Sequence, residues 1–228
     1  MTTAEGATRR AVEAVWRIES ARLIGGLINR VRDLDLAEDL AQQALVAALE
    51  TWPRTGIPDN PGAWLAATAR NRGVDLLRRR QMQARKHEAI AAEAVGAPGP
   101  RVPDVEGALD DAVGDDLLRL VLIACNPVLG TEARVALTLR LLAGLSTPEI
   151  ARAYLVPEAT VAQRIVRAKR TLAEARVPFE VPRGADLSAR LPSVLEVVYL
   201  IFNEGYAATS GADWMRTELC DVALRLGR

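Results

Sequence analysis

One predicted helix in the second half of the chain combines side chains that recognise bases with side chains that bind phosphates. Gln163, Arg164 and Arg167 recur on one side of this segment, and Lys169 and Arg170 follow them. The apolar residues fall on the opposite side, at Val161, Ile165 and Ala168. Arg and Gln hydrogen-bond to base edges, whereas Lys and Arg also suit phosphates. The segment therefore predicts a helix that enters a major groove.

The residues before this helix predict the rest of a helix-turn-helix. Ser146 or Thr147 is expected to cap a short helix, and a tight turn over 155–157 leads into the second one. Small Ala151 and apolar Leu155 are expected to let the two helices cross closely. A plain pair of antiparallel helices would show the same apolar pattern. The outward Gln and Arg side chains favour the DNA-binding interpretation.

Charge is segregated along the chain although the total is balanced, with 29 Lys and Arg against 29 Asp and Glu. Between Arg70 and Lys86 lie seven basic residues and a single acid, Asp75. The stretch 88–116 reverses this balance, with eight acids against Arg101. Arg clusters at helical spacing are typical of a protein with a polyanionic partner. Two solvated helix faces would give the same pattern, so charge alone leaves both interpretations open.

Composition favours an all-helical protein. Apolar residues make up 50% of the chain and aromatic residues only 4%, so Ala, Leu and Val must build the cores. No apolar stretch approaches the ~20 residues that span a bilayer, and residues 1–10 lack the apolar core of a secretory signal. A cytoplasmic location without a membrane segment is therefore expected. Cys125 and Cys220 are expected to be buried free thiols.

Enzymatic, metal and cofactor chemistry are not expected. The single histidine, His87, has no Cys or carboxylate at the spacing of metal ligands. The sequence shows no Gly-rich phosphate loop, and no motif unites a nucleophile, a base and an orienting group. The prediction is a binding protein without a catalytic site, a metal site or a cofactor.

Breaks in the helical pattern divide the chain into four parts. The expected parts are 1–86, a flexible acidic linker over 87–114, 115–177 and 178–228. Helices are predicted over 7–32, 36–51, 61–86, 116–125, 131–142, 147–154, 158–175, 187–204 and 212–226. Gly25 and Gly26 are expected to bend the first helix, and residues 52–61 to form a loop that ends at an Asn60 cap.

Two ordered sets of motifs resemble the extracytoplasmic-function (ECF) sigma factors of bacterial RNA polymerase. Residues 144–151 and 161–170 are similar to the family's sigma-4 domain. Residues 39–43 and 63–80 are similar to its sigma-2 domain, and the last part, 178–228, resembles the start of a helical, TPR-like C-terminal extension. The implied fold class is all-α: a sigma-2 helical domain, a linker, a sigma-4 helix-turn-helix domain and a partial extension.

The resemblance implies a sigma factor that binds core RNA polymerase, recognises the −35 and −10 elements of promoter DNA and begins to melt it. The residues implied to bind polymerase are Asp39, Gln42 and Gln43, the last standing where the family usually has an acid. Those implied to bind the −10 element are Arg70, Asn71, Arg72, Asp75, Arg78 and Arg79. Those implied to bind the −35 element are Thr160, Gln163, Arg164, Arg167, Lys169 and Arg170.

Simpler interpretations stand beside these roles. Asp39 and Gln42 share an outward polar helix face with Glu38, Asn71 could be an ordinary surface residue, and one of the arginines could pair with Asp75. Asn71 is expected to hold a flipped −10 base in a pocket that the 52–61 loop closes. The alternative function is a helix-turn-helix regulator that acts without core polymerase, which leaves the 39–43 motif unexplained.

The linker is long enough for two separated DNA elements. Elements ~25 base pairs apart at 3.4 Å each lie roughly 85 Å apart. About 27 extended residues span at most ~90–100 Å.

The last part of the chain is expected to regulate the others. Its apolar stripe consists of Leu191, Leu195, Val198, Phe202 and Tyr206. The stripe is too large to leave in water, so docking on the sigma-2 or sigma-4 domain is predicted, which would fix the two domains relative to each other. A regulatory partner is also possible through this extension. Arg228 falls within a predicted helix, so the chain is expected to be part of a longer protein.

Overall fold

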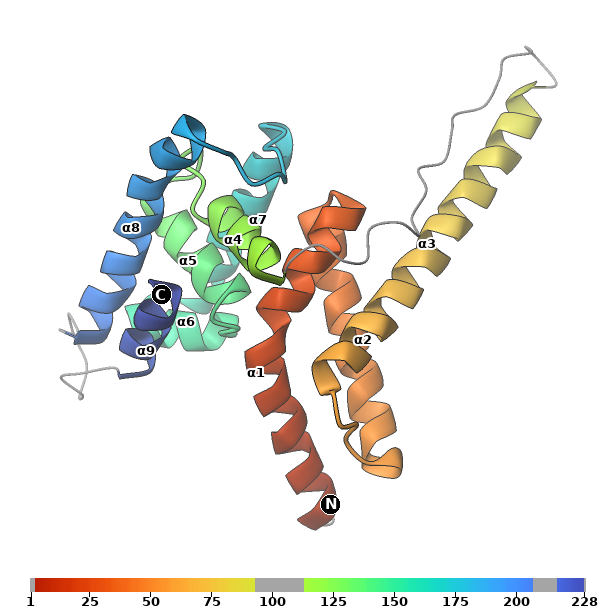
Figure 1. The fold of residues 1–228 in the computed structure, drawn as a ribbon, viewed down its shortest axis with the longest axis horizontal. Coiled ribbons are helices and arrows are strands. Elements are labelled where there is room, and N and C mark those ends of the chain that lie inside the picture. Colours follow the sequence, from red (N-terminus) through yellow and green to blue (C-terminus); the bar gives the residue numbers. More distant parts are fainter. Residues whose placement is uncertain (1–2, 93–112, 207–216, 228) are drawn as a thin grey trace.

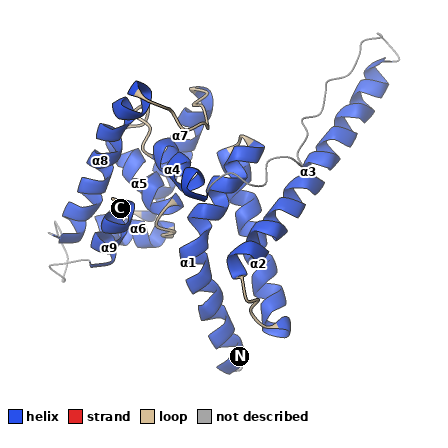
Figure 2. Cartoon of the chain, viewed as in Figure 1, coloured by secondary structure: helices blue, strands red, loops and turns tan. Residues whose placement is uncertain are grey.

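The structure is a computed structural model that describes residues 3–92, 113–206 and 217–227. Within these ranges the chain forms nine helices and no strand, which confirms the all-α prediction (Figure 2). None of the helices described is both long and apolar enough to cross a membrane.

The N-terminal helices are α1 (Thr3–Val31), α2 (Leu34–Thr55) and α3 (Pro61–Ala92). Side chains define where two of them begin: Asp33 Oδ1 accepts the N–H of Leu36 at 3.0 Å, and Asn60 Oδ1 accepts the N–H of Ala63 at 3.0 Å. Both α1 and α3 pack against α2, and the far half of α3 projects away from the rest of the molecule (Figure 1).

The predicted ends of α2 and α3 were wrong. The predicted loop over 52–61 begins only after Thr55, because α2 continues through Pro53. Trp52 is buried and packs edge-on against Trp64 with ring centroids 5.4 Å apart, which ties down this last turn. Pro53 is exposed, so the bond that it removes from the helix lies near water. The other error concerns α3, which extends to Ala92 into the predicted linker, whose residues 93–112 lie outside the described part.

The central helices are α4 (Val113–Ala124), α5 (Thr131–Leu141), α6 (Thr147–Tyr154) and α7 (Glu158–Glu174). They match the four predicted helices to within three residues at each end. The middle of this group is α5, which packs against α4, α6 and α7. Its residues Leu137 and Leu139 are completely buried.

The helix-turn-helix of α6 and α7 is confirmed, with one correction in its turn. Ser146 caps α6 in a reciprocal capping box with Glu149. Leu155, expected to lie between the helices, is instead 53% exposed with a left-handed φ of 50°. The left-handed residue reverses the chain direction, and the next residue, Val156, packs against the core instead.

The C-terminal helices are α8 (Ala185–Tyr206), which packs on α4 and α5, and α9 (Thr217–Leu226), which packs on α8. The extension therefore docks on the helix-turn-helix domain, as predicted. The face of α8 that docks is not the predicted apolar stripe. The buried residues of α8 are Ser193, Val197, Ile201 and Gly205. In the predicted stripe only Val198 packs against the core, and the exposed members are Leu191, Leu195, Phe202 and Tyr206.

Small residues explain which face of α8 is buried. Ser193 Oγ donates to the carbonyl of Cys125 at 2.6 Å and also accepts a hydrogen bond from Arg134. A side chain on Gly205 would lie 2.8 Å from the backbone nitrogen of Cys220 in α9. Neighbouring backbones therefore approach α8 along its small residues. The large side chains fall on the outer face.

The cysteine expectation holds in part. Cys125 and Cys220 are both free, but only Cys125 is buried, whereas Cys220 is half-buried. Burial raises the pKa of the Cys125 thiol to about 11. The final helix, α9, ends at Leu226, and Arg228 lies outside the described residues.

The N-terminal and central helices pack directly on each other through α1 and α4. Gly25 and Gly26 were expected to bend α1, yet α1 is a single helix through both. A Cβ atom on Gly25 would lie 2.4 Å from the carbonyl oxygen of Asp116 in α4. The glycine therefore lets α1 and α4 approach each other closely, and it does not bend α1. One hydrophobic core runs across the junction, from Leu40 to Leu139.

Candidate polymerase and promoter interfaces

The outer face of α2 carries the three residues that the sequence assigns to polymerase binding. Asp39, Gln42 and Gln43 are all exposed, and the buried side of the same helix includes Leu40 and Ala44. Their outward position agrees with a surface motif and equally with an ordinary polar helix face.

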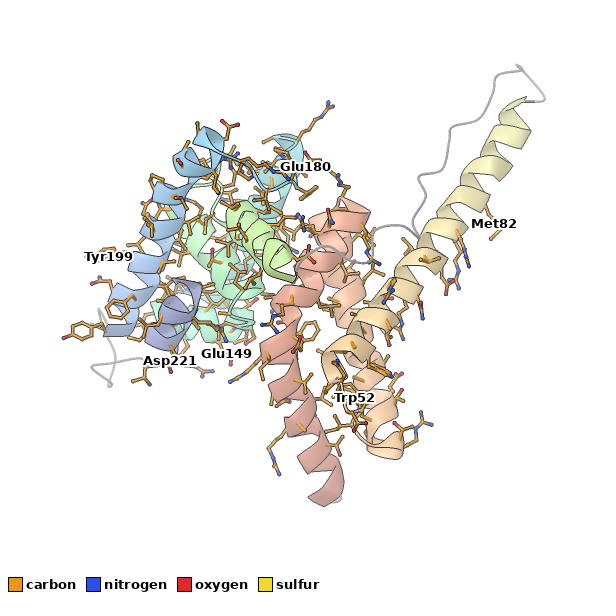
Figure 3. The ribbon with its side chains drawn as sticks, viewed as in Figure 1. Trp52, Met82, Glu149, Glu180, Tyr199 and Asp221 are labelled. Carbon is orange, nitrogen blue, oxygen red and sulfur yellow. The ribbon has the colours of Figure 1, made fainter. Side chains whose placement is uncertain are left out.

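The residues predicted for the −10 element follow one another along α3. Asn71, Asp75, Arg78 and Arg79 are exposed, and Met82 in Figure 3 marks the projecting part of the helix just beyond them. Among the described side chains no ion pair involves Asp75, so the alternative in which one of the arginines pairs with it finds no support there.

Two arginines of this set have structural neighbours that the sequence did not reveal. Arg72 Nη1 donates to the carbonyl of Gln43 at 2.8 Å, which joins α3 to the α2 motif. Arg70 lies near Arg30 of α1: burial first, and then the positive charge of Arg70, lower the pKa of Arg30, while Asp116 raises it. Two guanidinium groups and the carboxylate of Asp116 therefore influence one another where α1, α3 and α4 meet.

The residues predicted for the −35 element lie on the outer side of α7. Gln163, Arg167 and Arg170 are exposed, while Thr160 and Arg164 are half-buried. The inward residues are Val161, Ile165, Ala168 and Leu172, all buried, which confirms the predicted division of this helix.

Three of the cations on α7 already lie in ion pairs. Arg164 Nη2 lies 2.6 Å from Glu132 Oε2 on α5, and Arg170 pairs with Glu174 one turn further along the helix at 3.6 Å. The third, Lys169, reaches across to the N-terminal helices, where its Nζ donates to Asp35 Oδ1 at 2.7 Å.

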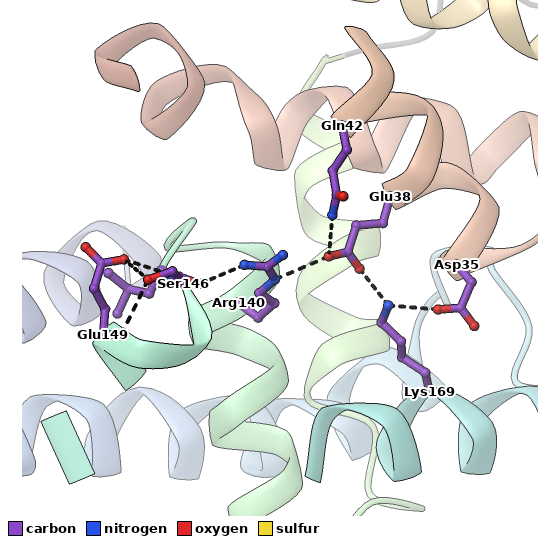
Figure 4. A network of polar contacts seen from close by, with 8 residues as sticks. Asp35, Glu38, Gln42, Arg140, Ser146, Glu149 and Lys169 are labelled. Carbon is purple, nitrogen blue, oxygen red and sulfur yellow. Dashed lines mark hydrogen bonds and ion pairs between the residues drawn. The ribbon is translucent and has the colours of Figure 1, made fainter. Parts of the chain in front are cut away.

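Glu38 of α2 is the centre of this cross-domain contact (Figure 4). Its side chain, expected to face outward, is only 8% exposed. Glu38 Oε2 lies 2.8 Å from Lys169 Nζ, and its Oε1 accepts from Arg140 Nε at 3.3 Å and Gln42 Nε2 at 3.4 Å. Burial alone would lower the pKa of Lys169, but the hydrogen bonds to Asp35 and Glu38 outweigh it and raise that pKa.

A second polar contact lies on the other side of the same junction. Arg17 of α1 donates to Glu149 Oε1 at 3.3 Å, and the other oxygen of Glu149 accepts from the backbone N–H of Ser146 at 2.7 Å. Sequence reasoning missed the four contacts between the N-terminal and central helices, Lys169 with Asp35 and Glu38, Arg140 with Glu38 and Arg17 with Glu149, because their partners are more than 100 residues apart. The spacing of Glu38 relative to Leu34 and Ala41, which places it on the buried side of α2, was the available signal.

No three His, Cys, Asp or Glu side chains gather as metal ligands in the part of the chain that the structure describes.

Comparisons with known proteins identify the class. The family model of sigma-70 region 2 matches residues 19–82, and that of sigma-70 region 4 matches residues 121–172. A family of unknown function, DUF6596, matches residues 190–228, which form most of the C-terminal helices. Hereafter region 2 denotes α1–α3 and region 4 denotes α4–α7.

Similarity to individual proteins agrees with these matches. The chain is 30% identical over 170 residues to a probable ECF RNA polymerase sigma factor, SigI, of Mycobacterium tuberculosis, covering 75% of this chain and 57% of SigI. It is 44% identical over 206 residues to an uncharacterized protein, R00370, of Rhizobium meliloti, covering 90% of this chain and 48% of that protein. The chain spans about half the length of the curated relatives it matches. It belongs to the sigma-70 factors of the ECF type, with regions 2 and 4 followed by a DUF6596 segment.

Proposed function

We propose that this protein is a sigma factor that directs bacterial core RNA polymerase to promoters and begins DNA melting there. The observation that carries the proposal is the presence of both regions in one chain, region 2 over 19–82 and region 4 over 121–172. A helix-turn-helix regulator that acts without polymerase needs only the second of them. The alternative function is therefore not favoured. Sigma factors work without covalent chemistry, and the proposed location is the cytoplasm, where the polymerase acts.

Three surfaces would carry this function. Asp39, Gln42 and Gln43 on α2 would contact the largest polymerase subunit. On α3 the proposed −10 contacts are Arg70, Asn71, Arg72, Asp75, Arg78 and Arg79. On α7 the proposed −35 contacts are Thr160, Gln163, Arg164, Arg167, Lys169 and Arg170. Their support is position: most of these side chains are exposed on the outer faces of their helices.

The division of labour along α7 follows from side-chain chemistry. Gln163, Arg164 and Arg167 lie in the first three turns, where a recognition helix meets base edges. Lys169 and Arg170 lie further along and suit phosphates. Asn71 would hold a −10 base that has left the duplex, because an unstacked base is recognised through its edges. The domain boundaries at residues 86, 114 and 177 remain a prediction.

The experiment is transcription by bacterial core polymerase from a library of randomised promoters, with and without the protein. Initiation that depends on the protein, with a shared sequence among the selected promoters, is the expected result. Asn71→Ala should retain polymerase binding and reduce permanganate reactivity of the −10 region. Absence of both polymerase binding and promoter selection would contradict the proposal.

A further inference from the structure

A carboxylate outside α7 contacts one of the proposed base contacts on that helix. Glu132 lies in the first turn of α5, and its Oε2 is 2.6 Å from Arg164 Nη2. The side chain of Glu132 is 73% exposed, whereas that of Arg164 is 28% exposed. Exposed ion pairs contribute little to stability, so folding does not require this pair. Its main effect is on the position of the Arg164 guanidinium group.

The shape of a guanidinium group lets Arg164 bind Glu132 and a base together. Arginine presents five N–H donors in a rigid planar fork. Two edges of this fork each offer a pair of N–H groups, and both edges include Nη2, which carries two hydrogens. A carboxylate at one edge therefore leaves the other edge for O6 and N7 of guanine. An arginine that is already held also loses less side-chain freedom when it binds the base.

Contacts with α8 hold Glu132 itself in place. The residue before α5 is Gly130, which has no side chain to cap the helix. Thr131 Oγ1 instead donates to Glu196 Oε1 of α8 at 3.3 Å and accepts from Arg134 Nη2 at 3.0 Å. The same Nη2 of Arg134 lies 2.9 Å from Glu196 Oε2. The first turn of α5, which carries Glu132, is thereby fixed from outside the helix.

We propose that Glu132 is a positioning residue for −35 recognition, which holds the guanidinium group of Arg164 with one edge directed at a guanine. The inference rests on the proposed function and deepens it, because it places a determinant of promoter specificity outside α7. Arg164 touches the base, and Glu132 acts through Arg164.

The negative charge of Glu132 has a second effect that must be separated from the first. Once Arg164 reaches a base, the carboxylate beside it lies close to DNA phosphates and repels them. This repulsion is the same for every base sequence. The ratio of affinities for two duplexes that differ at one base pair is free of it, so this ratio is the quantity to measure.

A matched control exists on α7. Glu132→Gln and Glu158→Gln each remove one carboxylate from an exposed position in the first turn of a helix of region 4. In the part of the chain that the structure describes, Glu158 belongs to no ion pair. The two variants therefore differ in the contact with Arg164.

The measurement uses the holoenzyme of the full chain and core polymerase on a promoter selected from the randomised library. Each base pair of its −35 element is changed in turn, and Arg164→Ala and Arg167→Ala identify the base pairs that these arginines recognise. Glu132→Gln should reduce discrimination about threefold at the base pair of Arg164, as loss of an exposed ion pair gives, and leave that of Arg167 unchanged. Glu158→Gln should change neither. In a protein that already carries Arg164→Ala, Glu132→Gln should have no further effect on discrimination.

The other outcomes decide against the inference. Increased discrimination in Glu132→Gln would show that the carboxylate competes with guanine for Arg164, and the positioning role would be overturned. It would also be overturned if Glu132→Gln and Glu158→Gln behaved alike, or if Arg164→Ala relaxed no base pair. In these cases the selected promoter still supports the proposed function. If the holoenzyme selects no promoter, the proposed function fails, and the positioning role fails with it.

Discussion

Region 2 and region 4 present their proposed contact surfaces in different states. On α2 and α3 the side chains of Asp39, Asn71 and Arg78 are exposed, and the far half of α3 projects away from the body of the protein. On α7, by contrast, Lys169 is largely covered and Arg164 is held by Glu132. The proposed surface of α2 is therefore open to solvent, whereas two of the proposed DNA contacts on α7 already have carboxylate partners within the protein.

Under the proposed function, polymerase would meet an exposed motif on α2, whereas the −35 element would meet a helix, α7, on which Arg164 and Lys169 already have carboxylate partners. A shared core and a cluster of ion pairs hold the two regions together. The predictions below separate these two kinds of contact.

The largest effect is expected from Leu120→Ala in α4. Leu120 is completely buried in a helix that packs against both α1 and α5. The cavity should lower the free energy of unfolding by about 2–5 kcal/mol. If the core is continuous, hydrogen exchange should accelerate in α1 as well as in α5. Acceleration confined to α5 would show that the regions are independent.

Gly25→Ala should separate the regions by steric conflict alone. The new methyl group would lie 2.4 Å from a backbone oxygen of α4, and such overpacking costs about 1–3 kcal/mol. Gly6→Ala is the control, because nothing lies within 4 Å of that position and a better helix former should stabilise α1 by about 0.5–1 kcal/mol. Denaturant unfolding of both variants measures the difference. Equal stabilisation by both would contradict the close approach of α1 and α4.

How much of this could be read from the sequence depends on the range of the interaction. The Asn60 cap and the two helices of the helix-turn-helix follow from residues within one turn of each other, and these predictions are confirmed. The acidic cluster at Lys169 joins residues 131 or more positions apart, so no local pattern indicates it.

The errors have the same origin. The buried face of α8 was misjudged because large apolar residues lie on both of its sides, and small Ser193 and Gly205 decide which side meets its neighbours. The end of α2 was misjudged because Pro53 indicates a break, whereas the burial of Trp52 maintains the helix. In both cases tertiary packing overrides a local signal.

Arg164→Ala tests whether α7, the proposed recognition helix of region 4, recognises base sequence. On duplexes selected from a random library, we expect a loss of about 1–3 kcal/mol in binding, because an outward Arg can bond a guanine edge bidentately. Scrambled duplexes should lose less. Exposed Arg152 on α6 gives the matched control, Arg152→Ala. Equal losses on selected and scrambled duplexes would assign Arg164 to phosphate contact.

The smallest effect is a pH dependence at the start of α6. Hydrogen bonds from Ser146, together with Arg17, lower the pKa of Glu149 below its ordinary value of 4.5. A lowered folded-state pKa stabilises the fold above the ordinary value, and this contribution is lost as pH falls through the lowered one. We expect the capping box, which contributes about 1 kcal/mol, to weaken in that acid range.

The start of α3 supplies the comparison for this pH dependence, because its cap, Asn60, has no proton to gain. Amide chemical shifts at the first turn of α6 should move as Glu149 gains a proton, whereas the cap hydrogen bond of α3, from the N–H of Ala63 to Asn60 Oδ1, has no titrating partner. Glu149→Gln should abolish the acid-dependent change in the amide chemical shifts of α6. A titration that is the same with and without Glu149 would exclude the carboxyl group as its cause.

The most direct test of the account measures the distance between α2 and α7 as polymerase binds. Labels fit at exposed Val46 and Val166 after Val→Cys substitution. Cys220 is replaced by Ser, while buried Cys125, with its raised pKa, stays unreactive. We predict a single short distance in the protein alone and a long one, tens of ångströms greater, after core polymerase and promoter DNA are added. A short distance that persists in a polymerase complex active in transcription would contradict the proposal that regions 2 and 4 bind separate promoter elements.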